Sequence, residues 1–213
     1  MRNWGHDNEA EHPDSETLGP ALEAQILDAA LDLFTSLGYL NVTLVDVAVR
    51  ASVPESVVAA KFATPFDLFE ALYEQVAGDC LRRVLDGVDL APNNFLEQLH
   101  AGVSEYVHAL LDDPRRARLI GVEANGISRA FDAKRRQERR TFAGLIAQLA
   151  VTYEDHHIIH VRLPNLTYAG LVSALFEMVS EYASLPAADR PPLDILIDEV
   201  ARFTKGVVVT PPL

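Results

Sequence analysis

Residues 43–62 carry the pattern that most constrains the fold of this chain. Thr43 is a residue type that caps helices, and Asp46 follows three positions later, at the spacing of a capping box. A short helical repeat runs from there to a turn at 51–54, and a second short repeat ends at Phe62. We therefore expect two short helices joined by a tight turn, as in a helix-turn-helix, whose second helix enters the DNA major groove.

Helical periodicity continues through the rest of the chain. Apolar residues recur three and four positions apart, and Gly, Pro or Asn-Gly separates the segments. The sequence predicts an all-α fold with about nine helices, in which an N-terminal three-helix helix-turn-helix unit precedes a larger helical body. The expected helices span residues 21–37, 44–50, 55–61, 65–87, 92–111, 114–126, 128–154, 164–185 and 191–207.

The chain divides into three parts by composition and pattern. Residues 1–20 are polar, acidic and aperiodic, which predicts a disordered tail. We assign residues 21–64 to the helix-turn-helix domain and residues 65–213 to the helical body.

Composition argues against several classes of protein. Cys80 is the only cysteine, so no disulfide framework is possible and a reducing, cytoplasmic setting is expected. No long uncharged apolar run predicts a membrane span. The chain lacks a nucleophile elbow, a phosphate-binding glycine loop and an HExxH motif, so we expect neither an enzyme nor a cofactor. The spacing of His156, His157 and His160 favours a solvated loop over a metal site.

The charge distribution conflicts with the helix-turn-helix pattern. The formal net charge is −13, and residues 21–78 carry two basic side chains, Arg50 and Lys61, against eight acidic ones. Attraction to nucleic acid comes from Lys and Arg side chains that neutralise phosphates. The segment that is patterned to meet DNA is therefore poor in the charge that this contact requires.

Between Ile26 and Phe69 the chain resembles the TetR family of bacterial transcriptional regulators. The spacing between the matching segments agrees with the family as well as their apolar pattern does. These segments are 26–34, 37–39, 42–48, 51–53, Phe62 and 67–69. The resemblance implies that DNA contacts come from Thr43, Arg50, Ser56, Val57 and Lys61.

The departures from the family pattern fall on the expected recognition helix. Glu55 stands where members usually have a basic residue, and Val57 replaces a groove-facing Thr. Ala59 and Ala60 cover the position of a phosphate-contacting Tyr, and Pro65 replaces a Lys that commonly contacts the backbone. Base contacts from such side chains could only be apolar.

Two functions follow from the resemblance. The first is a repressor that binds double-stranded operator DNA as a homodimer and is released by a small, apolar effector. The alternative is a homologue that has lost DNA binding and acts as a ligand-binding or protein-interaction dimer.

The resemblance also implies an effector site in the body. Polar groups amid apolar neighbours and possible aromatic walls are the candidates, although any one of them taken alone fits a surface or core residue better than a ligand contact. They are Phe95, Tyr106, Glu123, Asn125, Phe131, Phe142 and Tyr168.

The last two expected helices carry wide apolar stripes. Such faces need more partners than one bundle supplies, which favours a two-fold interface with a second copy, with core burial as the alternative. The interface candidates are Val172, Leu175, Phe176, Val179, Leu196, Val200 and Phe203.

A dense basic run covers residues 134–140. We interpret it as a solvated helix face with Glu138 as an internal ion-pair partner, the alternative being a contact for an anionic partner.

Overall fold

A computed structural model of the chain describes residues 19–154 and 165–209. In these ranges the protein contains nine α-helices and no strand, which confirms the expected all-α fold. The helices are α1 (Pro20–Leu37), α2 (Leu44–Arg50), α3 (Glu55–Lys61), α4 (Pro65–Leu90), α5 (Phe95–Leu111), α6 (Pro114–Arg118), α7 (Arg129–Glu154), α8 (Asn165–Ser184) and α9 (Leu193–Val208). Shorter elements are η1 (Tyr39–Asn41), the π-helix η2 (Leu119–Glu123) and η3 (Ala187–Asp189).

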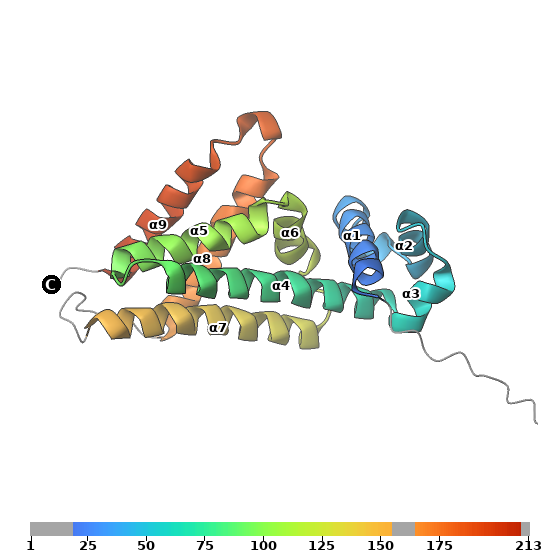
Figure 1. The fold of residues 1–213 in the computed structure, drawn as a ribbon, viewed down its shortest axis with the longest axis horizontal. Coiled ribbons are helices and arrows are strands. Elements are labelled where there is room, and N and C mark those ends of the chain that lie inside the picture. Colours follow the sequence, from blue (N-terminus) through green and yellow to red (C-terminus); the bar gives the residue numbers. More distant parts are fainter. Residues whose placement is uncertain (1–18, 155–164, 210–213) are drawn as a thin grey trace, which may run out of the picture.

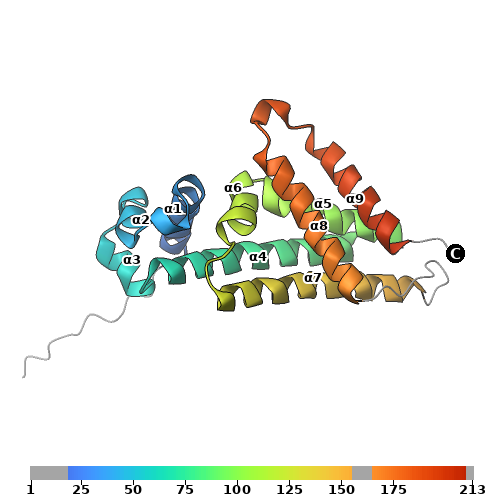
Figure 2. The same ribbon diagram turned by 180° about the vertical axis from the view of Figure 1, so that it is seen from behind.

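The helices form a small unit at one end of an elongated body (Figure 1). Helices α1 to α3 make up the unit, and α4 runs from it along the body with α7 beside it (Figures 1 and 2). Helix α5 contacts α4 and α9, and α8 contacts α7 and α9. Within the described ranges, no helix combines the length and the apolar character that a bilayer crossing requires.

Capping interactions fix the helix boundaries of the small unit. The Asp46 backbone N–H donates to Thr43 Oγ1 at 3.2 Å, and the Asp46 carboxylate accepts from the Thr43 N–H at 2.9 Å. Thr64 and Asp67 repeat this arrangement at the start of α4. Gly38 ends α1 with a φ of 84°, which glycine adopts without a Cβ clash. The predicted capping box is thus confirmed.

Two glycines occupy close helix contacts instead of ending helices. Helix α4 continues through Gly87, where a Cβ would lie 2.6 Å from Cγ of Glu105 on α5. The expected helix over 114–126 instead ends as the π-helix η2, in which Gly121 faces α8. A Cβ at Gly121 would lie 2.6 Å from Oγ of Ser180 and 3.1 Å from Cζ of Phe176. Each glycine therefore lets two helices approach more closely than a side chain would allow.

An aromatic cluster joins the small unit to the body. The Phe69 ring on α4 packs edge-on against Phe34 of α1 at 5.2 Å and Tyr39 of η1 at 5.1 Å, between ring centroids. On its other side it meets Phe131 of α7 at 5.7 Å, and Phe131 also contacts Tyr73. Because α4 supplies the central ring, the core of the unit continues into the body without a break.

The apolar stripes of α8 and α9 lie mostly inside the protomer. Five of the seven expected interface residues are at most 6% exposed, namely Val172, Leu175, Val179, Leu196 and Val200. Phe176 is half-buried, and Phe203 alone among the seven is exposed, at 41%. The buried part of these stripes packs against α5 and α7 of the same chain, which leaves Phe203 accessible to a second copy. An apolar stripe shows that a helix face is covered but does not identify the partner.

Candidate functional site

The helix-turn-helix surface is held by a few apolar residues that face α1. Val47, Ala48 and Val58 are at most 2% exposed, and they pack α2 and α3 onto the core of the unit. Ser56, Ala59 and Ala60 of α3 are exposed on the opposite side, while Val57 is half-buried. Among the expected DNA contacts, Thr43, Arg50, Ser56 and Lys61 are thus accessible.

Both cations of this surface are already paired with carboxylates of α1. Arg50 Nε lies 2.8 Å from Asp32 Oδ2, and Lys61 Nζ pairs with Glu23. Thr43 Oγ1 also donates to Asp46 Oδ2 at 2.6 Å. Ion pairs at exposed positions contribute at most about 1 kcal/mol, so a phosphate could displace them. The negative net charge and the exposed Glu55 at the start of α3 disfavour DNA binding more than these two ion pairs do.

Charged contacts connect the small unit to α6 and η2. Arg115 of α6 pairs with Asp28 of α1 at 2.7 Å and with Asp113 at 2.8 Å. Glu123 Oε2 accepts a hydrogen bond from the Tyr39 backbone N–H at 3.2 Å, and its Oε1 lies 3.4 Å from Arg118 Nε. Glu123, an expected ligand contact, therefore lies at the junction between unit and body.

Replacing Glu123 with alanine will destabilise this junction. The Tyr39 N–H loses its acceptor in a part-buried position, which costs about 1–3 kcal/mol. Amide hydrogen exchange followed by NMR should show faster exchange at Tyr39, with little change in α8. Glu123→Gln keeps an acceptor oxygen and serves as the control, which should lose less protection. Equal protection of Tyr39 in wild type and Glu123→Ala would contradict a role for this contact.

A cavity of about 390 Å³ lies in the body between α4, α5 and α7. Its middle is lined by apolar side chains, among them Val88, Val103 and Leu149. Four of the polar lining residues, Asp89, Asn93, Gln148 and Thr152, are exposed, so the cavity reaches solvent there, whereas the polar lining residue Thr204 is buried. A volume of this size, with apolar walls and few polar groups, is typical of a small-molecule site.

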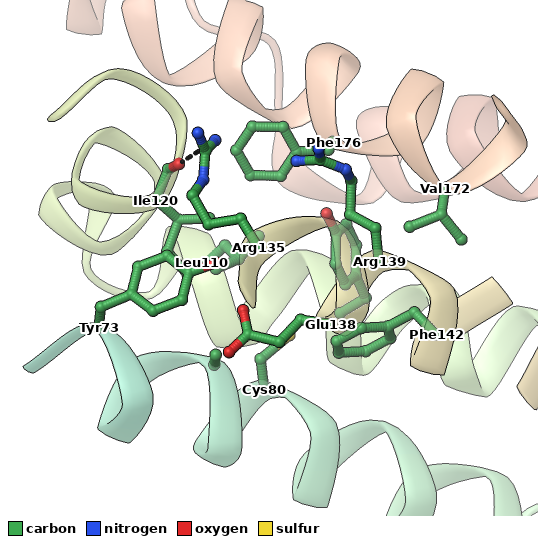
Figure 3. Close-up of a pocket in the computed structure, with 12 residues that line it drawn as sticks. Tyr73, Cys80, Leu110, Ile120, Arg135, Glu138, Arg139, Phe142, Val172 and Phe176 are labelled. Carbon is green, nitrogen blue, oxygen red and sulfur yellow. Dashed lines mark hydrogen bonds between the residues drawn. The ribbon is translucent and has the colours of Figure 1, made fainter. Parts of the chain in front are cut away.

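A second, smaller cavity of about 60 Å³ adjoins the first and shares Tyr106, Phe142 and Val172 with it. Figure 3 shows Arg135, Glu138 and Arg139 of α7 at this cavity, with the Arg135 guanidinium directed at Ile120 of η2. Arg135 donates from Nη2 to the Ile120 carbonyl at 3.2 Å and from Nη1 to the Ala124 carbonyl at 3.0 Å. The same guanidinium thereby holds two carbonyls at η2.

Burial shifts the titration of several groups at the smaller cavity. It raises the pKa of Glu138 above the usual carboxyl range, although the hydrogen bond from Tyr73 partly opposes this shift. Burial also raises the pKa of the Tyr106 phenol, and it raises the pKa of Cys80 to about 12. Cys80 therefore stays a thiol at neutral pH, which is the unreactive form.

The structure brings together only part of the expected ligand set. Tyr106 and Phe142 line both cavities. Phe95 and Phe131 are instead buried in aromatic contacts, and Asn125 accepts a hydrogen bond from Arg135 at 2.8 Å. Tyr168 is 4% exposed and lies outside the lining of either cavity.

Several residues that line the two cavities are not among the ligand contacts expected from the sequence. Val172, Leu175 and Phe176, expected at a dimer interface, line the cavities. Arg135, Glu138 and Arg139 were expected on a solvated face, and only their helical spacing could have indicated that they share one side of α7.

The described part of the chain contains no cluster of metal-ligating side chains. No group of three or more His, Cys, Asp or Glu side chains in that part could hold a metal ion. His156, His157 and His160, and the acidic residues of 1–18, lie outside the described residues.

A helix-turn-helix unit joined to a helical body with a ligand-sized cavity is the architecture of TetR-family transcriptional regulators, and this chain has their fold. It is similar to the fatty acid degradation regulator FadR from Bacillus halodurans, with a TM-score of 0.78 and 19% identity over 88% of this chain and 96% of that one. FadR from Bacillus subtilis, solved in complex with stearoyl-CoA, gives a TM-score of 0.73 and 17% identity over 87% and 97% of the two chains.

A putative TetR-family regulator from Syntrophomonas wolfei gives a TM-score of 0.73 at 13% identity, over 91% of this chain and 97% of that one. No sequence model of a known family matches the chain, and no curated protein matches it by sequence. At these identities the likeness establishes the fold.

Proposed function

We propose that the protein is a cytoplasmic transcriptional repressor that binds operator DNA as a homodimer and is released by a small apolar effector. The observation that carries this proposal is the 390 Å³ cavity in a body that is continuous, through α4, with a helix-turn-helix unit. The stearoyl-CoA complex of FadR from Bacillus subtilis supports an effector with a long apolar chain.

Helix α4 offers a direct route from effector to DNA. It lines the large cavity with Val84 and Val88, and it places Phe69 in the core of the small unit. If the effector binds more tightly when α4 lies in one orientation than in another, it shifts the population of protein molecules toward that orientation. The spacing of two small units in a dimer would change with it.

The outer face of α8 and α9 is the interface that we propose for the dimer. Ile195 and Phe203 are 53% and 41% exposed, and they lie eight residues apart on one side of α9. Leu166 on α8 is 83% exposed. Exposed apolar side chains on adjacent helices favour burial against a second copy.

A second candidate function is a homologue without DNA binding. The exposed Glu55 favours it, as do the carboxylates of Asp32 and Glu23 beside Arg50 and Lys61, because negative charge at this surface opposes a phosphate. Such a protein would keep the cavity and act as a ligand-binding or protein-interaction dimer.

Selection of random-sequence duplex DNA by the purified full chain at low salt separates these functions. A repressor enriches one palindromic sequence, since two-fold symmetry presents two copies of α3. In parallel, Leu145→Trp fills the large cavity and should abolish binding of a fluorescent apolar probe. Probe binding without DNA enrichment supports the second candidate, while neither activity in the folded protein contradicts both.

A further inference from the structure

Two cations of the basic run 134–140 on α7 face the interior of the helical body. Arg135 is the more buried, with 8% of its side chain exposed. Its Nη atoms donate to Ile120, Ala124 and Asn125, but its Nε has no hydrogen-bond partner. A donor that is buried and unpaired costs about 1–3 kcal/mol, which an acceptor in the cavity would recover.

Arg139 is half-buried at the same cavity and has no ion pair within the part of the chain described. By contrast, Lys134 of the same run pairs with Glu70 and Glu74 of α4. A guanidinium that faces a cavity without a carboxylate partner favours an anion there.

Acidic groups near the two guanidinium groups offset them only in part. Asp132 Oδ1 lies 3.8 Å from Arg135 Nη1, which is a distant contact. Glu138 accepts from Tyr73 but leaves its Oε2 buried and unpaired, and burial favours its neutral form.

The size of the smaller cavity limits what the anion can be. Its volume of about 60 Å³ is enough for only a few water molecules, each of which needs at least about 10–15 Å³. A carboxylate is of this size, whereas a nucleotide or a coenzyme A group is far larger. No Lys or Arg lines the large cavity in the residues described, so of the two cavities only the smaller one offers a cation to an anionic group.

We propose that the smaller cavity binds the carboxylate of the effector, whose apolar chain occupies the larger cavity past Tyr106, Phe142 and Val172. The effector is then an amphipathic monocarboxylate, with Arg135 and Arg139 as the donors. This inference rests on the proposed effector cavity and adds to it the chemical class of the ligand.

Binding of three probes with one chain length tests the inference. Decanoate, decanol and decylamine are titrated into the full-length protein by calorimetry, so that only the head group varies. We expect decanoate to bind about tenfold or more tightly than decanol, as one charge-assisted hydrogen bond would give. Decylamine should bind most weakly.

Substitutions within the basic run then locate the head group. Arg139→Gln should weaken decanoate binding and so remove the preference for decanoate over decanol. Arg140→Gln, an exposed neighbour in the same run, should keep the preference. Arg135 also holds η2, so Arg139 gives the cleaner test.

The possible outcomes distinguish the carboxylate assignment from the existence of an effector cavity. Equal binding of decanoate and decanol, or tighter binding of decylamine, would overturn the carboxylate assignment while leaving an effector cavity in place. A preference for decanoate that Arg139→Gln does not change would also overturn it. Failure of all three probes to bind would contradict both the assignment and the effector cavity.

Discussion

Phe69→Ala will lower the free energy of unfolding by about 3–5 kcal/mol. The ring is fully buried and lies at the centre of the aromatic cluster, against Phe34, Tyr39 and Phe131. Truncation removes contacts to three elements at once and leaves a cavity that they cannot easily close. Since domains of this kind are stable by about 5–15 kcal/mol, the loss is a large fraction of the total. Urea unfolding monitored by circular dichroism measures it.

Leu90→Ala at the other end of α4 is the control. Leu90 is 87% exposed, and its truncation should change the free energy of unfolding by no more than about 0.5 kcal/mol. If Phe69→Ala were no more destabilising than Leu90→Ala, the small unit and the body would not share a core at Phe69.

Glu55→Lys will strengthen binding to duplex DNA by about tenfold at low salt. Glu55 is exposed in the first turn of α3, where a helix-turn-helix approaches phosphates. The change removes a repulsive charge and adds an attractive one, so the slope of log K against log salt should steepen by about 1. Fluorescence anisotropy with a labelled duplex at several salt concentrations measures both quantities.

Glu97→Lys changes the net charge of the chain by the same amount at a different place. Glu97 is exposed in the first turn of α5, which begins where α4 ends, at the opposite end of the body from α3 (Figure 1). We expect it to have a much smaller effect on affinity. Equal effects of the two variants would mean that DNA responds to bulk charge and that α3 does not contact it.

Local signals predicted the fold well because they depend on neighbours in the sequence. The capping box at Thr43 and the end of the first helix at residue 37 both depend on a few residues, and the structure confirms them. Gly87 shows the limit of such signals. A glycine in a helical pattern can end a helix or admit a close neighbour, and Glu105 of α5 decides the outcome here.

The candidate site depended on contacts that the sequence does not encode locally. Lys61 pairs with Glu23 across two helices, a contact between residues far apart in the sequence. The stripe that contains Val172 and Leu175 was recognisable as apolar, but its partners proved to be α7 and the cavity. Charged runs on helices are usually solvated, so the inward orientation of Arg135 required the packing of η2 against α7.

The π-helix η2 limits how the body can rearrange. Ala124 donates to the Leu119 carbonyl at 3.0 Å, a bond that encloses one residue more than an α-helical bond does. Converting η2 to a regular α-helix would remove that extra residue from the turn. The helical residues that follow would then rotate by about 100°, the angle between successive residues of an α-helix. Glu123 would then lose its hydrogen bond to the Tyr39 amide in one step. The segment η2 can therefore change between discrete helical registers but cannot rotate gradually.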